Sequence, residues 1–263
     1  MKRENKVKQK LARGEVAIGI YATLPSPEIV ELAGLCGMDY VRIDCHHSAI
    51  DLETLGNMIR AAELTGMTPF VRVYNEPQRI LSALDMGALG IIVPDIHTAE
   101  DAKAAVEAAH YAPKGDRGLF SNCRSSDYGL FSGKQYIEWA SENVMVGLQI
   151  ENKDAIENIE EILAVPGIDF IMSGKNDLSQ SLGVGGDKNH PLVLEAEKKI
   201  AAAAQKAGIM VALNMNPFQG DAAESTKKLL AKGSKMITMG TDIGFISNNF
   251  KSVSAVVKQA IEA

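Results

Sequence analysis

Residues 40–64 read YVRIDCHHSAIDLETLGNMIRAAEL, a short strand-forming run followed, after a polar connection, by a helix-forming stretch. Tyr40–Asp44 is apolar and β-branched, which predicts a buried strand. Over Leu52–Leu64 the apolar residues recur every three or four positions, which predicts an amphipathic helix. The stretch is therefore one strand–helix unit, and the same pattern returns along the whole chain.

Eight such units fit into the 263 residues. The predicted strands are Val16–Ala22, Tyr40–Asp44, Pro69–Val73, Gly90–Pro94, Val144–Glu151, Asp169–Ser173, Ile209–Leu213 and Lys235–Gly240. The predicted helices are Pro27–Cys36, Leu52–Leu64, Glu76–Met86, Ala99–His110, Asp154–Ala164, Val193–Ala207, Asp221–Ala231 and Ile246–Ala263. Eight units in about 250 residues predict an α/β fold of the (β/α)₈ TIM barrel type.

A doubly wound open sheet is the alternative fold. Its Gly-rich turn after the first strand is missing, because residues 21–29 read YATLPSPEI. Continuous apolar runs such as IIVP (91–94) and FIMSG (170–174) fit strands covered on both faces. No linker or composition break divides the chain, so residues 1–263 are predicted to form one barrel domain.

Two segments stand outside the repeated units. The amphipathic N-terminal segment, with Val7 and Leu11 among charged residues, is predicted to form a helix that covers the lower end of the barrel. Lys114–Tyr136 is long and contains Gly, Ser and Asn, which is typical of a functional or mobile loop.

Composition narrows the class of protein. The net charge is −6, with Lys and Arg spread along the chain, which argues against a nucleic acid partner. No apolar run has the length of a signal peptide or a membrane span, so we expect a soluble cytoplasmic protein without a membrane partner. Cys36, Cys45 and Cys123 show no paired spacing and are predicted to be reduced thiols.

In a (β/α)₈ barrel, active sites assemble at the C-terminal ends of the strands. Polar groups that packing does not require lie within, at the end of, or directly after four predicted strands. These groups are Asp44 with Cys45, His46 and His47 behind it; Arg72 in FVRVYNEP; Gln149 and Glu151 in QIE; and Asp177 in GKNDLS, after the sixth strand.

The carboxylates suggest a metal site. Gln149 and Glu151 point to the same side of their strand, and Glu151 can converge with Asp177 from the next strand end. Two carboxylates with open positions suit a hard divalent cation such as Mg²⁺ or Mn²⁺, which keeps water or substrate oxygens as further ligands. Alternatively, each carboxylate caps a helix or forms a loop salt bridge. Arg72 binds an anion or forms a structural ion pair.

His46 and His47 are adjacent, so in extended backbone their side chains diverge and only one faces the site. Adjacent His and Cys also make a poor chelate, so a zinc site made of Cys45, His46 and His47 is disfavoured, and Cys45 is predicted to be a small buried thiol. His47 is the candidate general base, oriented by Asp44, because imidazole works near neutral pH and needs an orienting partner.

Taken in order, these motifs resemble the HpcH/HpaI family of class II pyruvate aldolases, whose type member cleaves 4-hydroxy-2-oxoheptanedioate. IDCHHS is similar to the family's I-D-x-E-H, and FVRVYNEP to its V-R-x-x-x-x-x-P region. VGLQIE is similar to V-x-x-Q-I-E, and FIMSGKNDLSQSLG to F-I-G-P-x-D-L-S-x-x-x-G. The similarity runs from about Gly19 to Asp242.

The resemblance implies a metal-dependent aldolase that cleaves a 4-hydroxy-2-oxo acid to pyruvate and an aldehyde. It implies these roles: Glu151 and Asp177 bind Mg²⁺, Mn²⁺ or Co²⁺; Gln149, the Gly174 backbone and Lys175 lie near the pyruvate moiety; Arg72 stabilises the enolate; His47 is the acid/base residue, held by Asp44; and Asp85 supports it from a neighbouring subunit. A homo-oligomer, a trimer or a hexamer, is also implied, in which the last helix packs on a neighbour through Phe250, Val253, Val257 and Ile261.

Two departures from the family pattern leave alternatives open. His46 stands where the family usually has Glu, which can alter proton movement or the choice of aldehyde. Lys175 stands where the family usually has Pro, and a class I aldolase would use such a lysine for a Schiff base. An acyl-CoA lyase of the citrate or malyl type and a non-catalytic barrel that binds a 2-oxo acid are further alternatives.

The aldehyde is the part of the substrate that the sequence defines least. Arg124, Ser125, Ser126 and Tyr128 of the long loop contact it, or they are ordinary surface residues. Arg117-Gly118 resembles an R-G pair of the family and positions a carboxylate end, or it forms a turn.

Overall fold

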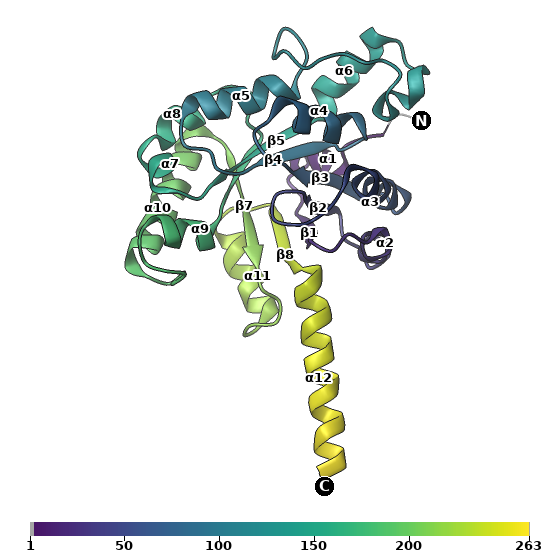
Figure 1. Ribbon diagram of the computed structural model, residues 1–263. Coiled ribbons are helices and arrows are strands. Elements are labelled where there is room, and N and C mark those ends of the chain that lie inside the picture. The colour runs from purple at the N-terminus through teal and green to yellow at the C-terminus, as the bar shows by residue number, and fades with distance from the viewer. Residues whose placement is uncertain (1–2, 263) are drawn as a thin grey trace.

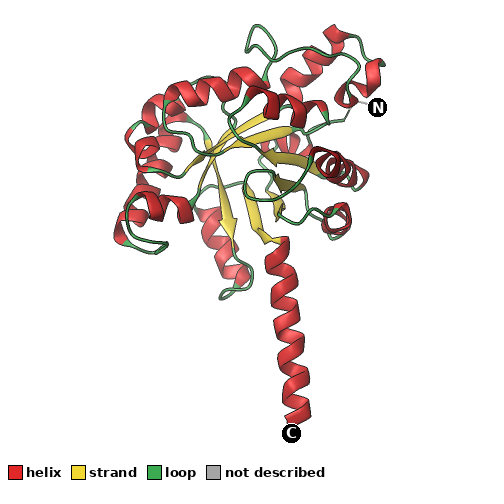
Figure 2. Ribbon diagram, in the orientation of Figure 1, coloured by secondary structure: helices red, strands yellow, loops and turns green. Residues whose placement is uncertain are grey.

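The computed structural model describes residues 3–262 and contains a closed barrel of parallel strands (Figures 1 and 2). Each strand pairs with the next, and β1 pairs with β8, which closes the barrel. The predicted (β/α)₈ barrel is confirmed, and the open sheet is excluded. The strands are β1 Ala17–Ala22, β2 Tyr40–Asp44, β3 Thr68–Arg72, β4 Gly90–Val93, β5 Met145–Ile150, β6 Phe170–Ser173, β7 Met210–Met215 and β8 Met236–Thr241.

Helices surround the barrel (Figure 2). They are α1 Lys6–Ala12, α2 Pro27–Leu35, α3 Leu52–Leu64, α4 Pro77–Asp85, α5 Ala99–Ala109, α6 Gly133–Asn143, α7 Lys153–Glu157, α8 Ile159–Leu163, α9 Lys175–Ser181, α10 Pro191–Ala207, α11 Ala222–Ala231 and α12 Asp242–Glu262. The predicted helix Asp154–Ala164 is two short helices, α7 and α8, and α6 and α9 were not predicted. Ala263, the predicted end of the last helix, lies outside the described residues.

Three aromatic rings fill the barrel interior. Adjacent rings meet edge to face, with centroids 5.8 Å apart, and each ring lies beside a glycine of the neighbouring strand. A Cβ atom on any of these glycines would come within 2.5 Å of the ring, so only glycine leaves the ring its space. This aromatic layer consists of Tyr40, Phe70 and Phe170, with Gly19, Gly90 and Gly147 as the facing glycines.

The N-terminal helix α1 covers the lower end of the barrel, as predicted. Val7 is fully buried and packs with the residues of the aromatic layer. Its N–H donates to Oγ1 of Thr68 on β3, and the side chain of Asn5 donates to the carbonyl of Leu89 at 3.0 Å. The cavity of the barrel is therefore reached from the C-terminal ends of the strands.

The C-terminal helix α12 extends away from the barrel (Figure 1). Its start is fixed by the buried Asp242, whose carboxylate accepts hydrogen bonds from the backbone N–H groups of Thr23 and Leu24. Farther along, Phe250 and Ile261 are 72% and 77% exposed. No helix among residues 3–262 is long and apolar enough to cross a membrane.

Candidate active site

A cavity of about 570 Å³ opens at the C-terminal ends of the strands. It lies where this architecture places active sites. The residues predicted from the sequence that line it are Asp44, His47, Arg72, Gln149, Gly174, Lys175 and Asp177. Glu151 is 3% exposed and lies directly beside this lining, where it contacts Gln149.

Arg72 and Asp44 form a buried ion pair with two hydrogen bonds. Nε of Arg72 lies 3.0 Å from one carboxylate oxygen of Asp44, and Nη2 lies 2.7 Å from the other. Burial acts to raise the pKa of Asp44, but the hydrogen bonds and charge of Arg72 outweigh it, so that the pKa lies below its usual value of 3.8. Both groups are therefore charged at neutral pH and held in a fixed orientation.

A chain of hydrogen bonds connects this ion pair to the carboxylate of Glu151. Nη1 of Arg72 lies 3.5 Å from Oε1 of Gln149, whose amide nitrogen donates to Glu151. The other oxygen of Glu151 accepts the backbone N–H of Asp95 at 3.0 Å. Asp95 has a φ of 54°, an uncommon value for a residue other than glycine, and this backbone turn aims its N–H at the carboxylate.

Glu151 and Asp177 are the two residues predicted to bind a divalent cation. Burial raises the pKa of Glu151 to about 7, and the nearby negative charge of Asp177 adds to the shift. Asp177 lies in the first turn of α9. Among residues 3–262, no group of three or more His, Cys, Asp or Glu side chains is arranged to hold a metal ion. Carboxylate oxygens are the donors that hard divalent cations prefer, so the chemistry of these two side chains fits such a cation.

The prediction that the side chains of His46 and His47 diverge is wrong. Nδ1 of His46 lies 3.3 Å from Nε2 of His47, and the ring centroids are 4.3 Å apart. The strand ends at Asp44, whose carboxylate accepts the backbone N–H groups of both histidines at 2.9 and 3.1 Å. This local turn replaces extended backbone, so the two rings meet on one side.

Asp44 therefore orients the backbone of His47, and no hydrogen bond joins it to the His47 ring. The ring of His46 packs at a tilt of 53° against the ring of Tyr74, with centroids 4.5 Å apart, and its Nε2 lies 3.2 Å from Oδ2 of Asp95. Burial lowers the pKa of His46. The neutral His46 ring thus lies between His47 and Asp95.

Lys175, the candidate Schiff-base residue, is paired with a carboxylate. Nζ of Lys175 forms an ion pair with Glu197 at 2.8 Å, and the lysine side chain is 43% exposed.

Burial raises the pKa of the Cys45 thiol to about 12, which leaves it protonated and unreactive. Cys36, Cys45 and Cys123 are all free thiols, as predicted.

Asp85 lies away from the cavity of its own chain. It is the last residue of α4 and pairs with Arg117 at 2.6 Å, and the Arg117 side chain is fully buried. A helix that follows a strand runs back toward the lower end of the barrel, so Asp85 lies far from His47 of the same chain. Any role of Asp85 at the cavity would require a second copy of the chain.

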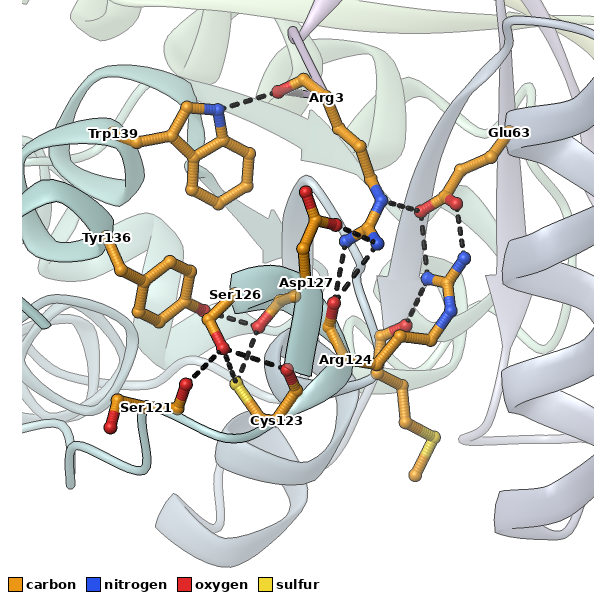
Figure 3. A network of polar contacts seen from close by, with 11 residues as sticks. Arg3, Glu63, Ser121, Cys123, Arg124, Ser126, Asp127, Tyr136 and Trp139 are labelled. Carbon is orange, nitrogen blue, oxygen red and sulfur yellow. Dashed lines mark hydrogen bonds and ion pairs between the residues drawn. The ribbon is translucent and has the colours of Figure 1, made fainter. Parts of the chain in front are cut away.

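The long loop is fixed to the body of the protein by a network of polar contacts (Figure 3). Arg124 forms an ion pair with Glu63, which also contacts Arg3 at 3.3 Å. Ser125 hydrogen-bonds the hydroxyl of Tyr136. In the described structure, none of Arg124, Ser125, Ser126 or Tyr128 lines the cavity of its own barrel.

Sequence reasoning missed Arg42 and Asp95. Arg42 is 1% exposed and lines the cavity, and its sequence signal is the one that identified Arg72, a charged residue inside an apolar strand. Asp95 contributes through its backbone N–H and its left-handed conformation, which no pattern of side chains reveals.

Comparisons with known proteins identify the family of the chain. The model of the HpcH/HpaI aldolase/citrate lyase family matches residues 17–249. The chain is 32% identical over 256 residues to a 5-keto-4-deoxy-D-glucarate aldolase of Klebsiella pneumoniae, with 97% of each chain covered.

Two solved structures are also similar. The citrate synthase SbnG has 33% identity and a TM-score of 0.86, with 97% of this chain and 98% of that chain covered. An HpcH/HpaI aldolase/citrate lyase family protein from Burkholderia cenocepacia has 30% identity and a TM-score of 0.88, with 97% and 99% covered. The protein therefore belongs to the HpcH/HpaI aldolase/citrate lyase family.

Proposed function

We propose that the protein is a divalent-metal-dependent aldolase that cleaves a 4-hydroxy-2-oxo acid to pyruvate and an aldehyde. The observation that supports this most is the connected set of Asp44, Arg72, Gln149 and Glu151 beside the cavity, with Asp177 close enough to influence the charge of Glu151. Family membership and the similarity to a 5-keto-4-deoxy-D-glucarate aldolase favour the same reaction.

The 2-oxo acid would bind at the β5 and β6 strand ends. Gly174 lets the backbone after β6 approach Gln149 and Glu151 closely, since a Cβ atom there would lie 2.2 Å from a carboxylate oxygen of Glu151. Gln149 and the Gly174 backbone would orient the acid. Arg72, held by Asp44, would place a fixed positive charge beside the oxygen that becomes negative when the carbon–carbon bond breaks.

His47 is the acid/base residue of this proposal. In cleavage its ring would accept the proton of the substrate's 4-hydroxyl group, and in condensation it would return that proton. Asp44 supports this role by fixing the His47 backbone, while His46 faces the His47 ring. A cation held by Glu151 and Asp177 would act as a Lewis acid that stabilises the enolate.

We also propose that the chain forms one barrel domain, residues 1–263, which assembles as a trimer or hexamer. The exposed apolar residues of α12, including Phe250, Val253 and Ile261, would pack on a neighbouring copy. In such an assembly, Asp85 of a second copy would support His47.

The test is a screen of 4-hydroxy-2-oxo acids in which pyruvate release is monitored. Cleavage should stop when a chelator is added and return with Mg²⁺, Mn²⁺ or Co²⁺. Cleavage that resists the chelator, together with borohydride trapping of pyruvate on Lys175, would favour the Schiff-base mechanism instead. If pyruvate binds but its methyl protons do not exchange in D₂O with metal present, the barrel only binds its ligand.

The similarity to a citrate synthase supports a second candidate, an acyl-CoA lyase or synthase reaction on the same scaffold. Lys188 and Lys232 are exposed cations that line the cavity, and they could contact the phosphates of a coenzyme A ester. Incubation with acetyl-CoA and 2-oxo acids, followed by assay of free thiol, separates this candidate from the aldolase.

A further inference from the structure

Arg42 is a charged residue of the cavity that the proposed reaction does not use. It lies on β2 two residues before Asp44, so both side chains point into the barrel. The guanidinium crosses the interior to the opposite strands, where its partners are Sδ of Met172, Oδ1 of Asn214 and Oγ1 of Thr238. All three partners are uncharged.

The other two buried arginines of residues 3–262 each face a carboxylate. Arg72 pairs with Asp44 at 2.7 Å, and Arg117 pairs with Asp85 at 2.6 Å. Arg42 is 1% exposed, less than either of them, and no carboxylate of the described chain lies within ion-pair distance. A guanidinium stays protonated in proteins, and a buried charge without a counter-ion is costly. The surroundings of Arg42 therefore suit an anion that the chain itself does not supply.

Arg42 and Tyr21 contact each other, and each has a buried polar atom without a hydrogen-bond partner in the described residues. Nε of Arg42 and the hydroxyl of Tyr21 are buried and make no hydrogen bond within residues 3–262. The guanidinium carbon lies 4.4 Å from the centre of the Tyr21 ring, and both residues line the cavity. Asn214, which accepts from Nη1 of Arg42 at 3.1 Å, is exposed, so packing does not hold its carboxamide in place. An entering anion can replace that carboxamide.

The space at Arg42 limits what can bind. Along β2 the inward-pointing residues are Tyr40, Arg42 and Asp44 in that order, so Arg42 lies between the aromatic layer below and the Asp44–Arg72 pair above. A large group cannot pass the aromatic layer. A carboxylate or another small oxyanion matches both this space and the planar fork of a guanidinium.

We propose that Arg42 and Tyr21 form a second anion site, which binds a carboxylate-sized oxyanion below the position of the 2-oxo acid. The anion comes from one of two sources, a second carboxylate of the bound 2-oxo acid or a free inorganic anion. The site itself is independent of the proposed function, and only the first source depends on it.

The test measures binding, so it does not require turnover. Wild type and Arg42→Met, each saturated with Mg²⁺, are titrated with pyruvate, with 2-oxoglutarate and with sulfate, and the dissociation constants and the unfolding midpoints are recorded. We expect Arg42→Met to fold, because replacing a buried unpaired charge by an apolar side chain is often neutral or stabilising.

If the source is the 2-oxo acid, wild type binds 2-oxoglutarate about tenfold or more tightly than pyruvate, and Arg42→Met loses this difference but keeps its affinity for pyruvate. If the source is a free anion, sulfate raises the unfolding midpoint of wild type and not of Arg42→Met, while the two acids bind wild type equally. Anion responses that are the same in wild type and Arg42→Met overturn the proposal.

Two further variants separate the site from general charge effects. Lys198→Gln removes an exposed cation of α10 outside the cavity lining and should respond to anions as wild type does. Tyr21→Phe removes only the unpartnered hydroxyl and should weaken the Arg42-dependent response severalfold. If Lys198→Gln abolishes the response as fully as Arg42→Met, the anions act through net charge and the proposal fails. A protein that shows the Arg42 effect but cleaves no substrate would refute the aldolase and leave the anion site standing.

Discussion

The two sides of the cavity differ in how completely the chain supplies their polar partners. On the β2–β5 side, Asp44, Arg72, Gln149 and Glu151 are joined by hydrogen bonds. On the β6–β8 side, Oγ of Ser173 and Oε1 of Glu197 line the cavity and are buried without a partner in the described residues, as is Nε of Arg42, whose guanidinium reaches this side.

This difference indicates which part of the site exists before a ligand arrives. Groups that already hold one another need no rearrangement when charge develops beside them, which is the condition for strong electrostatic stabilisation. Groups without partners gain hydrogen bonds when a ligand, an ion or a second copy of the chain supplies them. We therefore expect substitutions on the two sides to have different consequences.

The largest expected effect is on the β2–β5 side. Asp44→Asn leaves Arg72 buried without a counter-ion and should lower the free energy of unfolding by about 3–5 kcal/mol, as measured by urea denaturation. Arg42→Met, which removes a charge that has no counter-ion, should change it by less than about 1 kcal/mol. Equal losses in the two variants would contradict the comparison between the sides.

The low pKa of Asp44 gives the same variant a pH signature. Because this pKa is lower in the folded protein than the usual 3.8, the ionised carboxylate stabilises the fold above pH 3.8. That contribution is lost as the pH falls through the lower, folded value. Asp44→Asn should therefore lose less stability on acidification than wild type.

The next largest effect concerns Asp177, which with Glu151 is a proposed ligand of the cation. Asp177→Asn should lower kcat for cleavage by about 10²–10³-fold, because it weakens the site for the cation that stabilises the developing charge. Glu195→Gln is the matched control, since Glu195 is an exposed carboxylate on α10, outside the cavity lining. A variant Asp177→Asn with full activity and unchanged metal affinity would rule out this role.

A smaller effect is the pH dependence of metal affinity. The pKa of Glu151 lies near 7 without a cation, so protons compete with the metal below that pH. Metal affinity should rise about tenfold per pH unit up to pH 7 and then level off. Calorimetric titration with Mn²⁺ between pH 5.5 and 8.5 measures this, and a flat profile would show that Glu151 is not a ligand.

The smallest effect is expected at Lys175 on the β6–β8 side. Its ion pair with Glu197 is partly exposed, and such pairs contribute little. Lys175→Ala should reduce cleavage by less than about tenfold, and borohydride with pyruvate should trap no adduct on the wild-type protein. Loss of all activity together with trapping would make Lys175 the Schiff-base residue.

The repeated strand–helix pattern was sufficient to predict the barrel, and the predicted strands agree with the observed ones within two residues at each end. The prediction failed where helices lack apolar periodicity. Helix α9 is mostly polar over Lys175–Ser181, and its position after β6 depends on the rest of the barrel. Helix α6 begins at Gly133, inside the segment interpreted as a loop up to Tyr136, and continues to Asn143.

The candidate site was predictable to the extent that it depends on strand alternation. Inward-pointing positions at strand ends identified Asp44, Arg72, Gln149 and Glu151, which the structure brings together. The facing rings of His46 and His47 were not predictable, because they depend on a backbone turn made by the Asp44 carboxylate. The reach of Arg42 across the barrel was not predictable either, because it depends on the uncharged side chains that the opposite strands place there.

The aromatic layer has a consequence for the order of events in the proposed reaction. Tyr40, Phe70 and Phe170 close the lower part of the barrel interior, and α1 lies below them. Among the described residues, the cavity therefore opens only at the C-terminal ends of the strands. In the proposed reaction the 2-oxo acid would bind below the aldehyde portion, so the aldehyde would leave first and pyruvate second. This order of product release would make pyruvate the product that competes directly with substrate for the free enzyme.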